Sequence, residues 1–258
     1  MCSHCSIHRN ENSRHQTYSN LSFPHLLNFS KEVTIIINEE QPDLAASFHV
    51  PESLLTEKSE FLQAACRNEW KEASSRIIKL PDVEPDIFSL YLFWVHRDKL
   101  ALRNDWDPDG DDCEESALAV QTRLVKLWIL ADRLSDVRLC NIVIDEMVGA
   151  TEKSDSTGLF VLFPPDLTVL IWSATTAGRS IRRMVIDYYI TYVCVEGVEK
   201  NMYEHHPDFL KELMLAALHV VDNISPHGLI PAEKTEKSGC YYHDHVEEIP
   251  EQDCLQDK

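Results

Sequence analysis

The chain has 258 residues, of which 44% are hydrophobic, so it can bury one sizeable core or two small ones. Its formal net charge of −19 disfavours nucleic-acid binding, because phosphates repel such a surface, and favours partners with a basic surface. No apolar run approaches the ~18–20 residues that a membrane span needs, and the first residues lack the order of a signal peptide. We therefore expect a cytoplasmic or nuclear protein whose eight cysteines remain thiols.

The first half of the chain begins with a segment that predicts disorder and continues with two strands. Residues 1–30 are polar and show no periodicity. The β-branched run at residues 33–37 has the composition of a buried strand. Turn-forming residues at 38–42 then return the chain to a second extended segment at Phe48 and Val50.

The next stretch alternates between helix and strand signals. Apolar residues at three- and four-residue spacing between Leu54 and Ala65 predict one face of a helix. Residues 77–80 predict a third short strand. Pro85 suits the first position of a following helix. Because residues 87–95 are apolar almost all round, we expect that helix to lie inside the domain.

An acidic stretch at about residues 101–120 interrupts this pattern. Asp105, Asp107 and Asp109 copy the first half of an EF-hand calcium loop. The second half fails, because Ser116 stands where the loop needs a bidentate glutamate. We interpret the stretch as an acidic surface insertion, with calcium binding as the less favoured alternative.

The remainder of the chain predicts helices and a polar tail. Residues 122–134 and 137–148 form two amphipathic patterns, joined at a capping Ser135-Asp136 and ended by Gly149. After a polar linker, three more helices are predicted: residues 166–172, one capped by Ser180, and one after His206 in which apolar residues from Phe209 to Val221 repeat at helical spacing. Residues 225–258 are polar and predict a mostly disordered tail.

The order strand, helix, strand and buried helix resembles a BTB/POZ domain, of the kind found in fungal proteins. The motifs that carry the resemblance are Phe48-x-Val50, Ser53-Leu54-Leu55, Ser59-x-Phe61, Trp70-Lys71-Glu72, residues 77–81 and residues 90–95, with flanking motifs at 33–37, 124–134 and 141–145. The resemblance covers residues 31–149. Residues 150–224, with Gly178-x-Ser180-x-Arg182-Arg183, resemble the helical extension that fungal BTB proteins carry.

This resemblance implies an α+β fold, in which a short three-stranded sheet packs with helices and is followed by an all-α extension. It also implies a scaffold or adaptor for protein–protein interaction, which can self-associate and in some members recruits cullin-type ubiquitin ligases. We expect no enzyme, because the sequence has no Gly-rich phosphate loop, no G-x-S-x-G elbow and no H-E-x-x-H helix.

The partner surface implied by the resemblance includes Glu32, Glu52, Trp70, Lys71 and Glu72. Glu52 lies where the family usually has a basic residue, and Glu32 where it has an aspartate. Two acids thus replace an acid–base pair at the dimer groove, so we expect weak or absent homodimerisation.

Three further residues depart from the family pattern or offer a recognition role. Asp98 replaces a glycine after the buried helix and should tolerate the left-handed conformation there. Arg182 and Arg183 could form a recognition pair, but an ordinary solvated first turn of a helix is the favoured interpretation.

Four tail residues have the side chains of a zinc site. Cys240, His243, His245 and Cys254 supply the two thiolates and two imidazoles of tetrahedral zinc, although the His-x-His step is unusually short. Similar Cys-Tyr-His-x-His segments also end other fungal BTB proteins. A zinc-binding tail therefore remains the alternative to a disordered one, and we expect no other cofactor.

Overall fold

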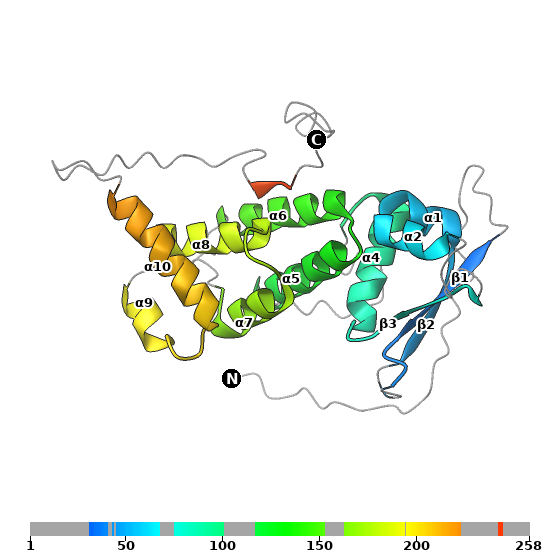
Figure 1. The fold of residues 1–258 in the computed structure, drawn as a ribbon, viewed down its shortest axis with the longest axis horizontal. Coiled ribbons are helices and arrows are strands. Elements are labelled where there is room, and N and C mark those ends of the chain that lie inside the picture. Colours follow the sequence, from blue (N-terminus) through cyan, green and yellow to red (C-terminus); the bar gives the residue numbers. More distant parts are fainter. Residues whose placement is uncertain are drawn as a thin grey trace, which may run out of the picture.

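The computed structural model describes residues 31–40, 43, 45–67, 75–100, 117–152, 163–193, 195–222 and 242–244. Within them the protein is a mixed α+β structure, mostly helical with one small three-stranded sheet. The predicted fold class is confirmed at this level. The sheet lies at one end of the molecule and α10 at the other, with the longer helices between them (Figure 1).

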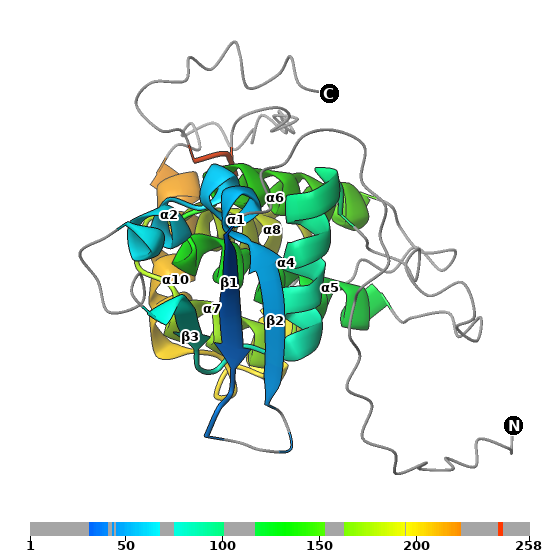
Figure 2. The same cartoon turned by 90° about the vertical axis from the view of Figure 1, so that its right-hand side faces the viewer.

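The sheet is built around β1 (Glu32–Ile37), the predicted buried strand. β2 (Ala46–Pro51) pairs with it antiparallel and β3 (Ile77–Leu80) pairs with it parallel, so the strand order is β2-β1-β3. Alternate side chains of β1 are buried, as the pleat of a strand with one core-facing side requires. Figure 2 shows this end of the molecule, where α1, α2 and α4 surround the sheet.

The helix predicted between residues 54 and 65 is in fact two helices, α1 (Glu52–Lys58) and α2 (Glu60–Cys66). Ser59 separates them in an extended conformation, with φ −124° and ψ 116°. Its Oγ accepts a hydrogen bond from Leu62 N at 3.0 Å and donates one to Leu134 O at 2.5 Å. These two hydrogen bonds offset the helical hydrogen bonds that are lost at the break. Apolar periodicity could not predict the break, because Leu134 is distant in sequence.

The predicted buried helix is α4 (Pro85–Arg97), and Pro85 begins it as expected. Its three largest buried side chains, Phe88, Tyr91 and Trp94, have no exposed surface. The Phe88 ring lies 5.0 Å from that of Phe48 on β2, so the helix packs on the sheet through aromatic contacts. Asp98 ends the helix with φ 53° and ψ 31°, the left-handed conformation expected of it.

Two long helices follow, α5 (Ala117–Arg133) and α6 (Val137–Glu152). Asp136 caps α6 as predicted, because its Oδ1 accepts a hydrogen bond from Leu139 N at 2.9 Å. Two predicted boundaries are wrong. α5 begins inside the 101–120 stretch. α6 continues through Gly149 to Glu152, and Gly149 does not adopt the left-handed conformation that would end the helix.

The extension contains α7 (Pro165–Ala174), α8 (Ser180–Tyr192), α9 (Val195–Lys200) and α10 (Pro207–Asp222). Of these, α9 was not predicted. α8 packs against both α6 and α10, and its buried side chains join those of the sheet and α4 in one hydrophobic cluster. α10 forms at the predicted place, and of its apolar pattern it buries Phe209 but exposes Val220 and Val221.

Candidate protein-interaction surfaces

Two of the five predicted partner-surface residues lie at one end of the β1–β2 ladder. Glu32 begins β1 and is exposed, whereas Glu52 begins α1 and is half-buried. The register pairs Glu32 with Pro51, and Glu52 N donates to Lys31 O at 2.9 Å. The backbone thus brings the two acids to the same edge of the molecule. Trp70, Lys71 and Glu72 lie outside the described residues.

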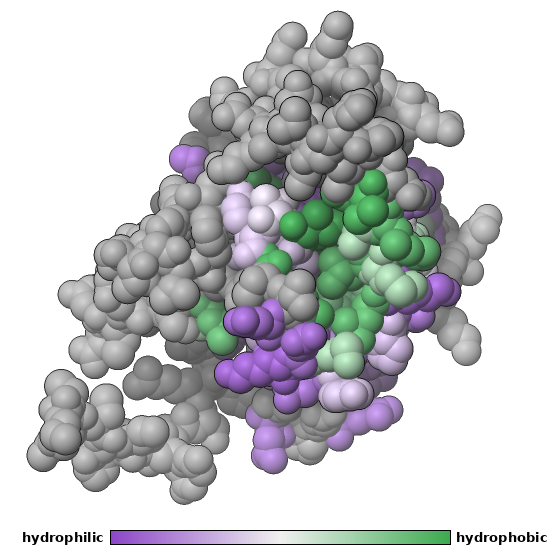
Figure 3. Space-filling model, turned by 90° about the vertical axis from the view of Figure 1, so that its left-hand side faces the viewer, coloured by the Kyte–Doolittle hydropathy of each residue, from purple (hydrophilic) through white to green (hydrophobic). Residues whose placement is uncertain are grey.

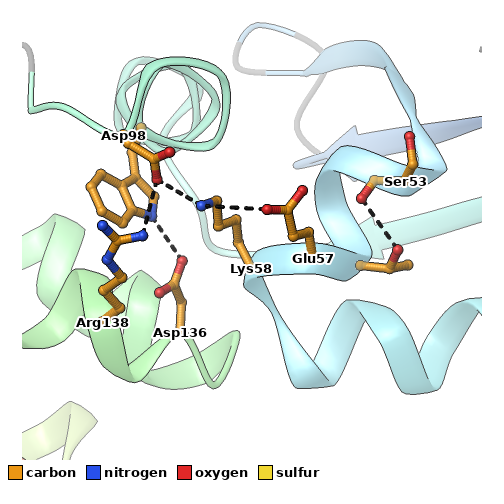
Figure 4. A network of polar contacts seen from close by, with 8 residues as sticks. Ser53, Glu57, Lys58, Asp98, Asp136 and Arg138 are labelled. Carbon is orange, nitrogen blue, oxygen red and sulfur yellow. Dashed lines mark hydrogen bonds and ion pairs between the residues drawn. The ribbon is translucent and has the colours of Figure 1, made fainter. Parts of the chain in front are cut away.

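A polar junction connects α1, α4 and α6 around the buried Trp94 (Figure 4). Lys58 Nζ lies 5.8 Å and Arg138 Cζ 5.4 Å from the centroid of its ring, so two cations contact the indole. Trp94 Nε1 donates a hydrogen bond to Asp136 Oδ2 at 2.9 Å. Asp98 completes the junction, because its Oδ1 lies 2.6 Å from Lys58 Nζ and 3.4 Å from Arg138 Nη1.

The charges of this junction are balanced within it. Burial raises the pKa of the Asp136 carboxyl, while hydrogen bonds from Leu139 N and Trp94 Nε1 oppose the rise. Asp98 lies at the C-terminus of α4 and forms ion pairs with Lys58 of α1 and Arg138 of α6. These ion pairs hold α1 and α6 against the end of α4. The junction is therefore a structural clamp for the three helices.

Arg182 forms a second clamp, so its interpretation as a solvated first-turn residue is wrong. Its guanidinium is buried and stacks 5.1 Å from the Trp172 ring. Nε donates to Thr175 Oγ1 at 2.9 Å, Nη1 to Glu212 Oε1 at 2.7 Å and Nη2 to Trp172 O at 3.0 Å. One side chain of α8 thus fixes the end of α7 and the side of α10. Arg183, in contrast, is largely exposed.

A buried histidine connects α7 to the segment before α10. His205 Nδ1 lies 2.9 Å from Thr168 Oγ1, which itself donates to Pro165 O at 2.8 Å. The hydroxyl has one proton, so His205 Nδ1–H is the donor in their contact. Burial lowers the pKa of His205, and Glu204 opposes this shift. The ring packs between those of Tyr189 and Phe209, at 5.7 and 5.0 Å.

Of the four predicted zinc ligands, the structure describes only His243. Its Nε2 lies 2.8 Å from Asp145 Oδ1 on α6. Cys240, His245 and Cys254 lie outside the described residues. Within the described part of the chain, no three potential metal ligands gather at one point. Zinc binding by the tail therefore stays an untested alternative.

The residues around this piece of tail lie partly in the motifs that carry the family resemblance, but none of them was predicted to contact the tail. Asn141 and Asp145 lie one turn apart on α6, and Ser180 and Asp187 lie on α8. Ser180 is the first residue of its helix rather than the predicted cap, and its hydroxyl donates to Asp244 Oδ2 at 2.9 Å. Polar residues at such spacings occur on most exposed helix faces, so no sequence signal would have selected them.

A row of exposed apolar side chains follows the second half of α10. Leu218 is 52% exposed and Val221 59%, and Met214 and Leu215 lie one turn before Leu218 with exposed side chains. We call Met214, Leu215, Leu218 and Val221 the α10 row. Figure 3 shows the end of the molecule where α10 lies, and apolar side chains gather there beside strongly hydrophilic ones.

Comparison with protein-family models finds no matching family, and comparison with curated proteins finds no significant match. Among the described residues, no helix combines the length and the apolar character that crossing a membrane requires. Function is therefore inferred from the surfaces and contacts described above.

Proposed function

We propose that the protein is an interaction scaffold or adaptor of the BTB/POZ type, which acts by binding other proteins and not by catalysis. The element order β1, β2, α1, α2, β3 and α4 supports this, because it is the order on which the sequence resemblance depends. A buried helix packed on a small sheet, followed by an all-helical extension, also agrees with it.

The α10 row is the observation that carries a binding function. Contiguous apolar side chains on the surface of a protein that is otherwise strongly acidic mark an interaction site more often than chance exposure. The row follows i, i+4 and i+7 spacing from Met214, which is the spacing by which one helix packs against another. At 1.5 Å per residue it is about 10 Å long, so about two turns of a partner helix would cover it.

The net charge of the segment that contains the row indicates the partner's chemistry. Residues 195–222 carry six carboxylates and only two lysines. A second copy of this chain would bring like charges together, whereas a helix with Lys or Arg beside its apolar face would meet opposite ones. The proposed occupant is accordingly an amphipathic helix of another protein, with basic residues at the edges of its apolar face.

The test uses the full chain with Met214→Glu and Leu218→Glu together. Both side chains are exposed, so the fold should tolerate the change. Leu118→Glu on α5 is the matched control, because Leu118 is 46% exposed on a different helix. Partners captured by the wild type are purified, and their affinities for the three proteins are measured by calorimetry at two salt concentrations.

We expect the double variant to lose at least about tenfold in affinity, which corresponds to 1.4 kcal/mol, while the control keeps it. The partner's affinity for the wild-type protein should also fall as the salt concentration rises. Equal affinity for the double variant would refute the assignment of the row. Concentration-dependent self-association that the double variant abolishes would assign the row to a second copy instead.

The resemblance extends the proposal to cullin-type ubiquitin ligases, for which the surface near Glu32, Glu52, Trp70, Lys71 and Glu72 is the proposed contact. A purified cullin should then bind the full chain, and Glu52→Lys should change the affinity while the α10 double variant should not. No binding at micromolar concentration would remove cullin recruitment from the proposal and leave the α10 row as the remaining site.

A further inference from the structure

A piece of the tail lies against two helices that are remote from it in sequence. Residues 242–244, the short red segment in Figure 1, contact α6 and α8. Tyr242 and His243 are each only 8% exposed. The contact is made within the chain, and each of the three tail residues has its own binding partner.

The backbone of the segment is bound at two points by one side chain. Asn141 Nδ2 donates to Asp244 O at 2.9 Å, and Asp244 N donates to Asn141 Oδ1 at 2.9 Å. A carboxamide that satisfies both the donor and the acceptor of one residue recognises peptide backbone itself. This pairing holds the backbone at one residue, and the side-chain contacts decide which residue that is.

The side chains are bound by separate residues. Tyr242 OH donates to Asp187 Oδ2 at 3.1 Å, and His243 Nε2 contacts Asp145 Oδ1 at 2.8 Å. On Asp244, one carboxylate oxygen accepts from Ser180 Oγ at 2.9 Å, and the other lies 3.8 Å from Arg183 Nη2.

The site is also electrostatically suited to its ligand. Ser180 begins the 13-residue helix α8, so the Asp244 carboxylate lies at the positive end of the helix dipole as well as near Arg183. The imidazole and the phenol meet carboxylates, which accept their hydrogen bonds. A segment with its carboxylate at either of the first two positions would oppose that carboxylate to Asp187 or Asp145.

We propose that Asn141, Asp145, Ser180, Arg183 and Asp187, here named the tail site, form a peptide-recognition site. Its ligand is a short segment that presents a phenol, an imidazole and a carboxylate at successive positions. The chain's own residues 242–244 fill the site in cis and compete with any segment of the same chemistry that is offered in trans. The site is distinct from the α10 row and does not depend on it.

The competition has an expected size. A tethered segment has an effective concentration on the order of 1 mM. If the free segment binds with a Kd of about 100 µM, occupation in cis weakens the binding of an added peptide by about tenfold.

The test uses a fluorescent peptide of residues 238–248 and full-length protein, with a chelator present so that no metal joins the two. The full-length variant Tyr242→Ala/His243→Ala empties the site, and it should bind the peptide about tenfold more tightly than the wild type does. Adding Asn141→Ala or Ser180→Ala to that variant should abolish binding. A peptide with the same two alanines is the control and should not bind.

Amide hydrogen exchange provides a second measurement that needs no added peptide. The Asp244 amide, which donates to Asn141 Oδ1, should exchange at least tenfold more slowly in the wild type than in Asn141→Ala. The proposal is overturned if the peptide binds the wild type and the emptied variant equally. It is equally overturned if the folded emptied variant does not bind, or if the Asp244 amide is unprotected.

Discussion

At the scale of single residues, Trp94 connects packing to polar contacts. Its ring is 0% exposed, and its Nε1 donates to Asp136 at 2.9 Å. We expect Trp94→Ala to lower the free energy of unfolding by roughly 3–5 kcal/mol, through lost burial and a residual cavity. Urea denaturation measures this loss, which is large beside a typical total of about 5–15 kcal/mol.

The matched control for Trp94→Ala is Tyr203→Ala, because Tyr203 is a large aromatic residue that is 93% exposed. It should change the unfolding free energy by no more than about 0.5 kcal/mol. Trp94→Phe should fall between the two, since it keeps most of the ring but leaves the Asp136 oxygen without its indole donor. If Trp94→Ala lowered the free energy of unfolding by less than about 1 kcal/mol, the assignment of Trp94 to the core would be contradicted.

A second prediction at this scale concerns His205 and pH. Burial lowers the pKa of His205 below its usual 6.5, so the unfolded chain binds this proton more readily than the folded one. The stability that the neutral imidazole contributes is present above pH 6.5 and is lost as pH falls through the lowered pKa. The melting temperature should therefore fall as the pH is lowered from 7.5 to 5.

His205→Asn should reduce that decrease, because the amide can donate to Thr168 from the position of Nδ1 but does not titrate. It should not abolish it, since burial lowers the pKa of His96 as well. His219→Gln, a change at an exposed residue of α10, is the control and should retain the wild-type pH profile. An unchanged profile in His205→Asn would contradict the assigned role.

At the scale of elements, Arg182 decides how α7, α8 and α10 fit together. Arg182→Ala removes hydrogen bonds to Thr175, Trp172 and Glu212 and leaves their acceptors without this donor. Because Glu212 keeps some exposure, we expect a loss of about 2–4 kcal/mol in unfolding free energy, somewhat below that of a fully buried pair. Chemical denaturation provides the measurement.

Two variants test whether geometry or charge is responsible for the Arg182 effect. Arg182→Lys keeps the charge but not the planar fork, so it should recover less than half of the lost stability. Arg183→Ala changes the neighbouring, largely exposed arginine and should cost less than about 1 kcal/mol. Full rescue by lysine would show that charge alone is sufficient.

At the scale of the whole molecule, self-association depends on the edge that holds Glu32 and Glu52. A symmetric contact through this edge would gather four carboxylates, so we expect weak or absent homodimerisation at neutral pH. Light scattering at low salt should show more dimer for Glu52→Lys than for the wild type. A tight wild-type dimer that Glu52→Lys leaves unchanged would contradict the charge hypothesis.

Zinc content is the second prediction for the whole molecule. Cys240, His245 and Cys254 still constitute a possible ligand set with His243, but the His243 imidazole already contacts Asp145. We expect purified protein to contain well under one zinc per chain. A stoichiometric zinc that is lost in Cys240→Ser and Cys254→Ser, and that binds more weakly as pH falls, would establish a metal-binding tail instead.

The sequence by itself determined the main elements and their burial. The β-branched run of β1, the apolar pattern of α4 and the capping Asp136 are local signals, because each depends on residues only a few positions apart. Asp98 has the left-handed conformation expected at a position where the resembled family has glycine. The proximity of Glu32 and Glu52 was implied by the family resemblance, and the strand register brings the two residues to one edge.

Only the tertiary structure decided which polar groups meet. Ser59 breaks a predicted helix because Leu134 O lies beside it, and Asn141 binds Asp244 across 103 positions of sequence. Arg182 is buried because Glu212 and Trp172 surround it. Each such contact contributes only about 0.5–3 kcal/mol and is possible for many pairs of polar residues. Chain folding, which is driven by apolar burial, selects the pairs that come within hydrogen-bonding distance.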